Sequence, residues 1–288
     1  MNKVLIIGCG DIGRRVATHY SNDEASNLHA WVSSVESASI ESWIEQRDLD
    51  SRYLALPKGV ERIYWFAPPS ATSDDDTRIA NFLDANPQLK LSRLVYISTT
   101  AVYGDSKGEW IDENYPLQPG SMRGYRRLSA ETQLIQAAAK HNFSLVILRV
   151  PGIYGPGRWP LARLEKRLPM LCKVDAPYTN RIHQDDLATA AIAAMTKAKV
   201  VSGESRAFNV SDGQPSTMTD YFDQIADAFK LERPLQLPRA EAEKVLTQAM
   251  MSFLTESKRI SSKRIREELD WQPKYPNLAA GLAKDHQP

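Results

Sequence analysis

The stretch KVLIIGCGDIGRRV, residues 3–16, decides the fold. Its opening run of aliphatic and β-branched residues is typical of a buried strand. Three glycines follow with the spacing Gly8-x-Gly10-x-x-Gly13, and the chain then continues as the amphipathic RRVATHY. The stretch therefore predicts a strand, a tight turn and a helix in that order.

Each glycine has a separate function in a turn of this kind. The first permits the tight turn, the second lets the backbone approach a pyrophosphate, and the third lets the helix pack closely on the strand. The helix N-terminus adds N–H groups and a partial positive charge. We therefore predict a dinucleotide site whose residues are Gly8, Gly10, Asp11, Ile12, Gly13 and Arg14.

The end of the second strand, predicted at 28–34, indicates which dinucleotide binds. An acidic residue about 20 residues after the turn would bind the ribose 2′-hydroxyl of NAD. Ser33 and Ser34 stand there instead, and hydroxyl groups donate to a 2′-phosphate that a carboxylate would repel. Arg14 either adds positive charge or is simply an exposed residue of the first helical turn. The pattern favours NADP, although Glu36 supports NAD if the strand is shifted in register.

The rest of the chain alternates between the two secondary structures. Strand patterns recur at 62–69, 93–99 and 144–150, and helical patterns at 77–86, 123–141 and from about Asp185. This alternation predicts an α/β protein with a Rossmann-type doubly wound parallel sheet. Residues 37–56 show no clear strand and look rather helical around IESWIEQ, which leaves the third strand open.

The C-terminal third changes character from about Gly213, where helices alternate with proline-punctuated loops. We predict two domains on this basis. Residues 1–155 with 181–212 form the dinucleotide-binding Rossmann domain, and residues 156–180 with 213–288 form a smaller, mostly helical substrate-binding lobe.

Composition narrows the functional class. The 36 Lys and Arg residues balance 35 Asp and Glu residues, so no charge excess favours nucleic acid or an anionic membrane. The apolar run after Met1 is too short for a signal peptide or a membrane span, and we expect a cytoplasmic protein. Cys9 and Cys172 are predicted to stay as thiols, and no Cys/His cluster has the spacing of a metal site.

Several segments, in order along the chain, resemble the extended and atypical short-chain dehydrogenase/reductase superfamily, the NAD-dependent epimerase/dehydratase family. YISTTAVYGD, at 96–105, looks like the strand that carries a catalytic Ser or Thr. LRVPGIYGPGR, at 148–158, is similar to the stretch that borders the nicotinamide and opens the substrate lobe. NRIHQDDLA, FNVSDG and KRIREELDWQPKYPNLAAGL resemble later family segments. The match is closer to an atypical branch with GxGxxG and with APP at 67–69.

The resemblance implies a Ser or Thr, a Tyr and a Lys that share proton transfer while hydride moves to or from a nicotinamide. Alignment on Val102 gives the Ser/Thr role to Thr99. Alignment on Glu131, within RGYRRLSAE, places Arg127 at the Lys position and Arg123 at the Tyr position. Arginine donates no proton near neutral pH.

The nearest phenol, Tyr125, is two residues from the tyrosine position, which is about 200° around a helix. The predicted catalytic residues are therefore Thr99, Tyr125 and Arg127, in a degenerate version of the family's Tyr-x-x-x-Lys site.

The resemblance also implies further binding residues. Those expected against the cofactor are Ala67, Pro68, Pro69, Ser98, Arg127, Pro151 and Gly152. Those expected against the substrate are Tyr103, Tyr154, Arg158 and Arg181.

The family's sugar-nucleotide enzymes carry an Arg four residues before the histidine that corresponds to His183. Here that position is Thr179, and Arg181 follows two residues later. This departure puts a nucleotide sugar in doubt, while Arg158 and Arg181 remain candidates for an anionic group. His183 is predicted to be a packed, hydrogen-bonded residue, with Asp185 or Asp186 as the N-cap of the helix that follows.

Two functions follow from these patterns. The first is an NAD(P)-linked oxidoreductase or epimerase/dehydratase-like enzyme for a small carbonyl or sugar-type substrate. Its proton would come from Tyr125, Tyr103, Tyr154 or a water held by Thr99 and Arg127. The second is a non-catalytic NAD(P)-binding redox sensor or interaction protein. We expect no nucleic-acid or membrane partner, and a monomer or a homodimer formed through helices near 123–141.

Overall fold

The computed structural model describes residues 3–20, 27–33, 43–71, 73–246, 251, 254 and 256–285. Its centre is a seven-stranded sheet in the order β12-β7-β5-β4-β1-β2-β3, and every neighbouring pair of strands is parallel. The prediction of a Rossmann-type sheet is confirmed. The strands are β1 (Lys3–Ile7), β2 (Leu28–Val32), β3 (Ile44–Gln46), β4 (Val60–Trp65), β5 (Arg93–Thr99), β7 (Ser144–Val150) and β12 (Ser205–Asn209).

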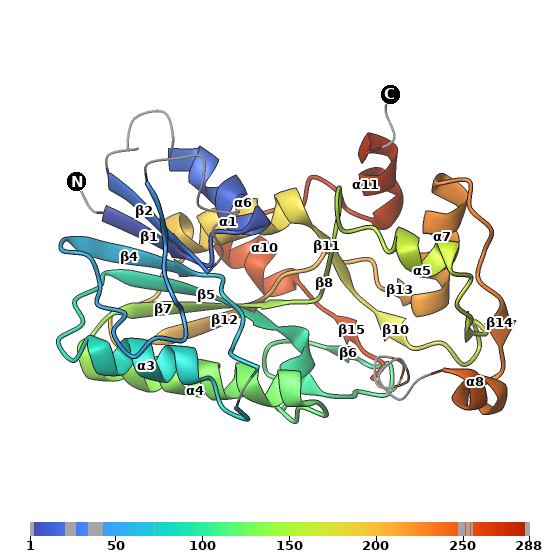
Figure 1. Ribbon diagram of the computed structural model, residues 1–288, viewed down its shortest axis with the longest axis horizontal. Coiled ribbons are helices and arrows are strands. Elements are labelled where there is room, and N and C mark those ends of the chain that lie inside the picture. Colours follow the sequence, from blue (N-terminus) through green and yellow to red (C-terminus); the bar gives the residue numbers. More distant parts are fainter. Residues whose placement is uncertain are drawn as a thin grey trace.

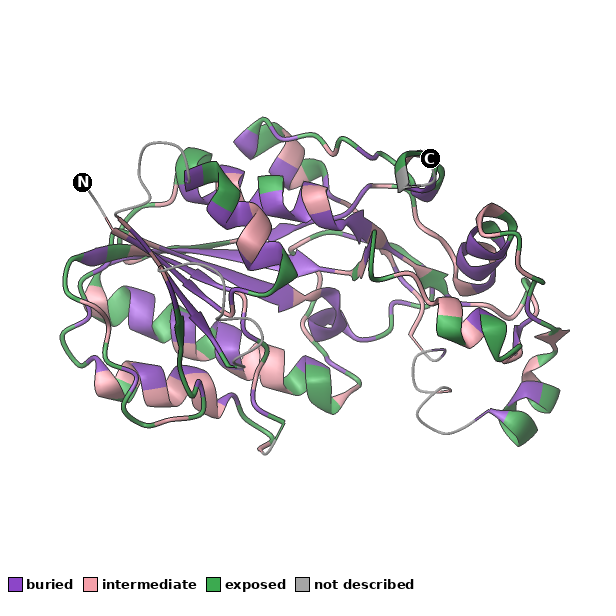
Figure 2. Cartoon of the chain, turned by 45° about the horizontal axis from the view of Figure 1, so that its top comes forward, coloured by how far each residue is buried: buried purple, intermediate pink, exposed green. Residues whose placement is uncertain are grey.

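Helices cover both faces of the sheet (Figure 1). One face carries α1 (Asp11–Ala17), α6 (Gln184–Lys197) and α10 (Lys263–Leu269), and the other carries α3 (Thr77–Ala85) and α4 (Met122–His141). Alternate residues of β1 enter different cores: Val4 and Ile6 pack toward the α1 and α6 side, Leu5 and Ile7 toward the α3 and α4 side. A strand buried on both faces is a continuous apolar run, as KVLII is. Figure 2 shows the sheet buried between these layers.

A smaller lobe lies beyond the carboxyl ends of the strands, on the right in Figure 1. It has its own apolar core, which includes Leu164, Leu171, Phe222, Ile225 and Leu282. The domain limits remain a prediction. The helices of this part are α5 (Leu161–Glu165), α7 (Met218–Ala228), α8 (Arg239–Val245) and α11 (Leu278–Asp285).

Short strand pairs lie outside the central sheet. They are β8 (Gly152–Tyr154) with β11 (Arg181–His183), β10 (Tyr178–Thr179) with β13 (Ser216–Thr217), β9 (Met170–Leu171) with β14 (Gln236–Leu237), and β6 (Trp110–Ile111) with β15 (Arg259–Ile260). Two 3₁₀ helices, η1 (Thr18–Tyr20) and η3 (Thr100–Tyr103), follow α1 and β5.

Two local predictions are wrong. The helical reading of IESWIEQ fails at Ile44–Gln46, which forms the edge strand β3 paired with β2. Three residues are too few to show a strand period, and only pairing with β2 defines them. The N-cap of α6 is His183, whose side chain accepts a hydrogen bond from the Asp185 N–H, not Asp185 or Asp186. The predicted packing of His183 is confirmed, since it is fully buried.

Within the described residues, no helix combines the length and the apolar character that crossing a membrane requires. Cys9 and Cys172 are both described, and neither forms a disulfide. The described residues also contain no group of three or more His, Cys, Asp or Glu side chains arranged to hold a metal ion.

Candidate active site

The glycine turn lies at the carboxyl end of β1, where the strand order reverses between β1 and β4. Ligands of open α/β sheets bind at such a switch point. Gly8 has φ +85°, and a Cβ there would stand 2.4 Å from the Ala67 backbone nitrogen. The backbone N–H groups of Gly8 and Cys9 both donate to the carbonyl of Trp31. The turn is therefore held tightly between β2 and β4.

The other two glycines face different surroundings. A Cβ at Gly13 would meet Ile6 and Cys9 at 3.1–3.3 Å, so this glycine lets α1 pack on β1. A Cβ at Gly10 would have no atom within 4 Å, and α1 begins there without a side-chain cap. Open space over Gly10 and uncapped N–H groups fit the diphosphate of a dinucleotide.

Charged side chains border the turn. Asp11, the first residue of α1, pairs with Arg15 at 2.9 Å and with Arg158 at 3.1 Å. Arg15 also pairs with Asp185 of α6. The structure therefore places Arg158, predicted to bind substrate, beside the glycine turn. Ser33 is exposed after β2, while Ser34 and Glu36 lie outside the described residues.

A cavity of about 250 Å³ lies where β5 and β7 end, and we call it the inner cavity. It brings together many residues that the sequence assigned to the cofactor or to catalysis, from four separate segments of the chain. The predicted site residues that line it are Pro68, Pro69, Ser98, Thr99, Arg127 and Pro151. The other lining residues are Ile97, Arg123, Arg126, Val150 and Ile153.

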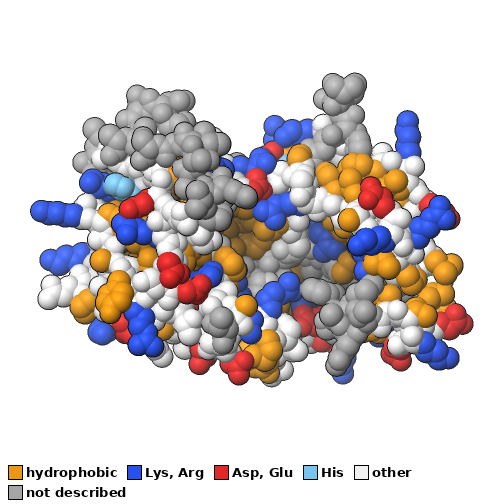
Figure 3. All heavy atoms as spheres, in the orientation of Figure 1, with side chains coloured by type: hydrophobic (Ala, Val, Ile, Leu, Met, Phe, Trp, Pro, Cys, Tyr) orange, Lys and Arg blue, Asp and Glu red, His pale blue; other side chains and the backbone are white. Residues whose placement is uncertain are grey.

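A larger cavity of about 520 Å³, the outer cleft, opens between the sheet and the smaller lobe. Thr99, Arg123, Pro151 and Ile153 line both cavities, so the two lie next to each other. Figure 3 shows the surface hollowed between these two parts of the molecule. Two further predicted residues, Gly152 and Arg181, line the outer cleft.

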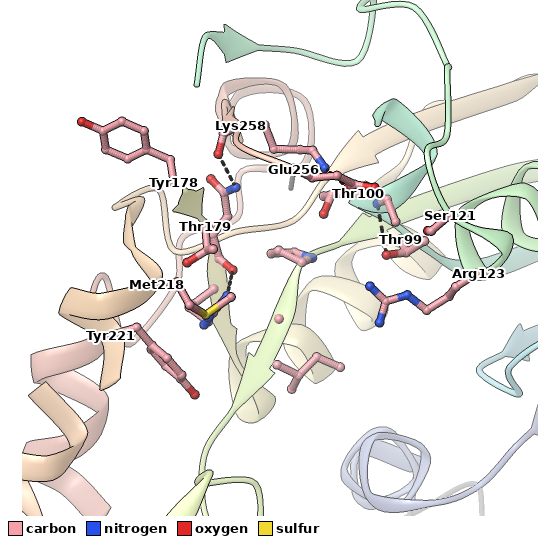
Figure 4. Close-up of a pocket in the computed structure, with 16 residues that line it drawn as sticks. Thr99, Thr100, Ser121, Arg123, Tyr178, Thr179, Met218, Tyr221, Glu256 and Lys258 are labelled. Atoms are coloured by element: carbon pink, nitrogen blue, oxygen red, sulfur yellow. Dashed lines mark hydrogen bonds and ion pairs between the residues drawn. The ribbon is translucent and has the colours of Figure 1, made fainter. Parts of the chain in front are cut away.

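Thr99 ends β5 and caps η3, where its Oγ1 accepts a hydrogen bond from the Ala101 N–H at 3.2 Å. Accepting this bond leaves its hydroxyl proton available for a ligand. In Figure 4 the guanidinium of Arg123 lies beside Thr99 and points into the cavity. The side chain at the family's tyrosine position thus lines both cavities but is a permanent cation.

Arg127, at the family's lysine position, donates to the Ile97 carbonyl at 2.7 Å and to the Tyr96 hydroxyl at 3.0 Å. Tyr96 is fully buried, and burial raises its pKa well above the ordinary value. Arg127 therefore provides positive charge at the inner cavity, while Tyr96 keeps its proton.

None of the three predicted tyrosines lines either cavity. Tyr125 is 52% exposed and lies on the outer side of α4 with Met122 and Leu128. Tyr103 and Tyr154 are buried, and their hydroxyls donate to Asn209 and to the Asn277 carbonyl respectively. The helix is regular through Gly124, so the two-residue offset of Tyr125 turns it away from the cleft.

A buried ionic network that sequence reasoning missed lies behind Thr99. Glu131 of α4 pairs with Arg149 of β7 at 2.8 Å and accepts a hydrogen bond from Ser98. Arg149 also donates to the hydroxyl of Tyr103 at 3.0 Å. This network joins α4, β5 and β7 at the edge where Thr99 emerges.

Sequence reasoning also missed most of the outer cleft's polar wall. Lys258 and Glu256 form a close ion pair at 2.6 Å there, and Lys258 is 6% exposed. They come from a segment before β15 with no motif of its own. The lining residues that were not predicted are Thr100, Ala101, Ser121, Ile153, Tyr178, Thr179, Asn180, Met218, Tyr221, Glu256 and Lys258.

A buried carboxyl near the cleft gives a prediction on pH. Burial raises the pKa of Asp212 to about 7, against hydrogen bonding from Gln214 and the charges of Arg181 and Arg266. The folded protein then holds this proton more tightly than the unfolded chain, in which the pKa is about 3.9. The resulting stabilisation is present below about pH 4 and is lost as the pH rises through about 7.

Replacing Asp212 by Asn removes this titration and retains an oxygen for the Gln214 N–H. Between about pH 4 and 7 we expect the free energy of unfolding of wild type to fall relative to Asp212→Asn, by at most about 1.4 kcal/mol per pH unit. Urea unfolding at a series of pH values checks this. A difference that does not change with pH would contradict it.

The fold and the site define the class of short-chain dehydrogenases/reductases: a Rossmann sheet with a glycine turn at its switch point, Thr99 at the end of β5, and a second lobe beside the cleft. The chain belongs to the NAD dependent epimerase/dehydratase family, whose family model matches residues 4–211.

Similarity to curated proteins is local. The chain is 28% identical to dTDP-D-glucose 4,6-dehydratase of Homo sapiens over 89 residues, which is 31% of this chain and 25% of the human protein. The match to the Mus musculus protein of the same name is 30% over 81 residues, 28% of this chain and 23% of that protein. The matched segment thus spans about a quarter of these relatives.

Similarity to solved structures extends over nearly the whole chain. A conserved protein of unknown function from Silicibacter pomeroyi is 28% identical, with a TM-score of 0.81 over 98% of this chain and 97% of that one. UDP-glucose 4-epimerase from Thermotoga maritima, solved with UDP-glucose, has a TM-score of 0.79 at 17% identity (99% and 97% covered). dTDP-glucose 4,6-dehydratase from Bacillus anthracis, solved with NAD, has a TM-score of 0.77 at 18% identity, over 99% of this chain and 95% of that one. The last two show the fold alone.

Proposed function

We propose that this protein is an NAD(P)-dependent enzyme that oxidises and reduces a sugar-type or small carbonyl substrate in the outer cleft. The observation that carries the proposal is the position of Thr99, at the carboxyl end of β5 and in the wall of both cavities. Family membership and the fit of the glycine turn to a diphosphate support it.

The nicotinamide, when bound, supplies the hydride acceptor or donor. Gly8, Gly10 and Gly13 would hold the diphosphate, and Arg127 would bind the adjacent ribose. Ala67, Pro68, Pro69, Pro151 and Gly152 would flank the cofactor.

Thr99 would donate its hydroxyl proton in a hydrogen bond to the reacting substrate oxygen, and the cation of Arg123 would stabilise negative charge there. Because the three predicted tyrosines do not reach the cavities, the proton would come from a water held by Thr99 and Arg127.

The choice between the two dinucleotides remains part of the proposal. Ser33 at the end of β2 favours NADP, whereas the Bacillus anthracis neighbour holds NAD. A cytoplasmic location and a monomeric or dimeric state also stay predictions. Binding of both cofactors must therefore be compared before any assay of turnover.

Replacing Thr99 by Val, which has nearly the same shape, is expected to slow hydride transfer about 100-fold, because a hydrogen bond to the reacting oxygen is lost. The measurement mixes the dinucleotide-loaded protein with UDP-glucose, dTDP-glucose or free hexoses and follows reduced nicotinamide. Thr132→Val is a matched control, since Thr132 donates to Leu128 O on the exposed side of α4.

Equal rates for Thr99→Val and wild type would remove Thr99 from the mechanism. A wild-type protein that binds the dinucleotide but transfers hydride with no substrate in the panel would favour the alternative, a non-catalytic redox sensor or interaction protein.

A further inference from the structure

Three arginines of α4 line one wall of the inner cavity. Arg123, Arg126 and Arg127 are three and four residues apart, so they lie on the same face of the helix. All three line the inner cavity, and Arg123 also lines the outer cleft. Among the described residues, no aspartate or glutamate belongs to the lining of the inner cavity. Its wall therefore carries three positive charges and no negative charge.

The helix itself adds to this positive charge. The three arginines lie in the first two turns of α4, whose N-terminus carries a partial positive charge. Acidic side chains are the ones that a helix N-terminus stabilises, and α4 has none in its first turn. Arg123 and Arg127, four residues apart, also repel each other. The potential of the helix terminus and that of the side chains thus have the same sign.

Neutral groups hold two of the guanidinium groups in place. Arg126 donates to two backbone carbonyls of the loop 71–73. Arg127 donates to the Ile97 carbonyl and to the Tyr96 hydroxyl. Neither arginine forms an ion pair within the described part of the chain, and all of these acceptors are uncharged. Such acceptors orient a guanidinium without cancelling its charge.

Two buried carboxylates lie near this wall, and they offset little of its charge. Glu131, one turn further along α4, is already paired with Arg149 at 2.8 Å. Asp76 caps α3 and is 1% exposed, and its charge acts on Arg127 through space. Burial raises the pKa of Asp76. Even when it is ionised, Asp76 offsets only one of the three positive charges.

Under the proposed function, the nicotinamide end of the dinucleotide is bound beside Thr99, at this cavity. The oxidised nicotinamide ring carries a positive charge that the reduced ring lacks, so nearby cations disfavour the oxidised form alone. We propose that Arg123, Arg126 and Arg127 make the site selective for the reduced dinucleotide, and that the protein works as a carbonyl reductase. This inference rests on the proposed function and gives the direction of its reaction.

In that direction the substrate carbonyl is converted to an alcohol. Its carbon receives a hydride, with two electrons, from the reduced nicotinamide, and its oxygen receives a proton from the water held by Thr99 and Arg127. The C=O double bond becomes a C–OH group, and the dinucleotide is left in its oxidised form. The arginines stabilise negative charge that develops on the oxygen, and they favour release of the positively charged nicotinamide product.

The ratio of two dissociation constants, that of the oxidised form divided by that of the reduced form, tests the inference. Isothermal titration calorimetry of the full chain measures it for NADP⁺ with NADPH and for NAD⁺ with NADH. Contacts that both forms share cancel in the ratio. We expect the reduced form to bind wild type about 10- to 100-fold more tightly. Each factor of ten raises the midpoint potential of the bound couple by about 30 mV.

Variants of the arginines separate charge from folding. Arg123→Gln and Arg126→Gln should each lower the ratio about threefold or more, because one cation is lost. Arg123→Lys retains the charge and should retain the ratio. Arg123 is exposed, so its replacement leaves the core intact. Lys140→Gln is the matched control, since it removes the same charge from the exposed last turn of α4, on the order of 25 Å along the helix. It should keep the wild-type ratio.

The inference is overturned if wild type binds the two forms equally, or if Arg123→Gln and Arg126→Gln keep the wild-type ratio. These outcomes leave the proposed function standing, because the dinucleotide is still bound. If wild type binds neither form of either dinucleotide, the proposed function and the inference both fail.

Discussion

Replacing Glu131 by glutamine is expected to lower the free energy of unfolding by about 3–5 kcal/mol, because the change leaves the cation of Arg149 buried without its carboxylate. The exposed fractions of the two side chains are only 1% and 7%. Burial alone would lower the pKa of Arg149, but the hydrogen bond and the charge of Glu131 outweigh it and raise that pKa. Neither side chain can turn to solvent when its partner is removed. Urea unfolding of the variant and of wild type measures the loss.

An exposed pair of the same chemistry provides the control. Arg206 and Glu268 form an ion pair whose side chains are 44% and 40% exposed. Glu268→Gln should lower the free energy of unfolding by less than about 1 kcal/mol, because water replaces the lost partner. Equal losses for the two variants would mean that the Glu131–Arg149 pair contributes no more than a surface contact. The Glu131–Arg149 network would then not support the strand end that carries Thr99.

Much of the lining of the inner cavity could be predicted from the sequence, because its residues follow strands. The carboxyl ends of parallel strands meet at one edge of a sheet, so residues after β1, β4, β5 and β7 converge there. Thr99, Pro68 and Pro151 come from three such ends, and all line the inner cavity. Arg127 joins them from α4, at the position that its alignment on Glu131 indicated.

The surroundings of the residues predicted to bind substrate could not be predicted in the same way, because tertiary contacts define them. Tyr103 follows a family-like motif, but its hydroxyl donates to Asn209, which is 106 residues away in the chain. Arg158 belongs to a loop whose partner, Asp11, lies at the start of α1. Lys258 precedes a two-residue strand that is defined only by its pairing with β6. No local pattern shows such neighbours.

The glycine turn carries the second large effect. Gly10→Ala is expected to weaken dinucleotide binding about 100-fold, because its methyl group would occupy the open space that the diphosphate needs. The free energy of unfolding should fall by at most about 1 kcal/mol, since no atom lies within 4 Å of the new Cβ and the position is only a helix cap. Gly8→Ala should also destabilise the protein, because its Cβ meets the Ala67 backbone at 2.4 Å in a positive-φ conformation.

Gly157→Ala separates backbone strain from collision. Gly157 also has a positive φ, +76°, but a Cβ there has no atom within 4 Å. Its free energy of unfolding should fall by the conformational cost alone, about 1–2 kcal/mol, and Gly8→Ala should lose more. If the two variants lost equal stability, the close approach of Gly8 to the Ala67 backbone would not constrain the turn.

The most direct measurement is a fluorescence titration of wild type and Gly10→Ala with NADH and NADPH, with both proteins first shown to unfold at nearly the same urea concentration. We expect wild type to bind one or both dinucleotides saturably, and Gly10→Ala to bind them about 100-fold more weakly. A wild-type protein that binds neither dinucleotide, or a Gly10→Ala variant that binds as tightly as wild type, would contradict it.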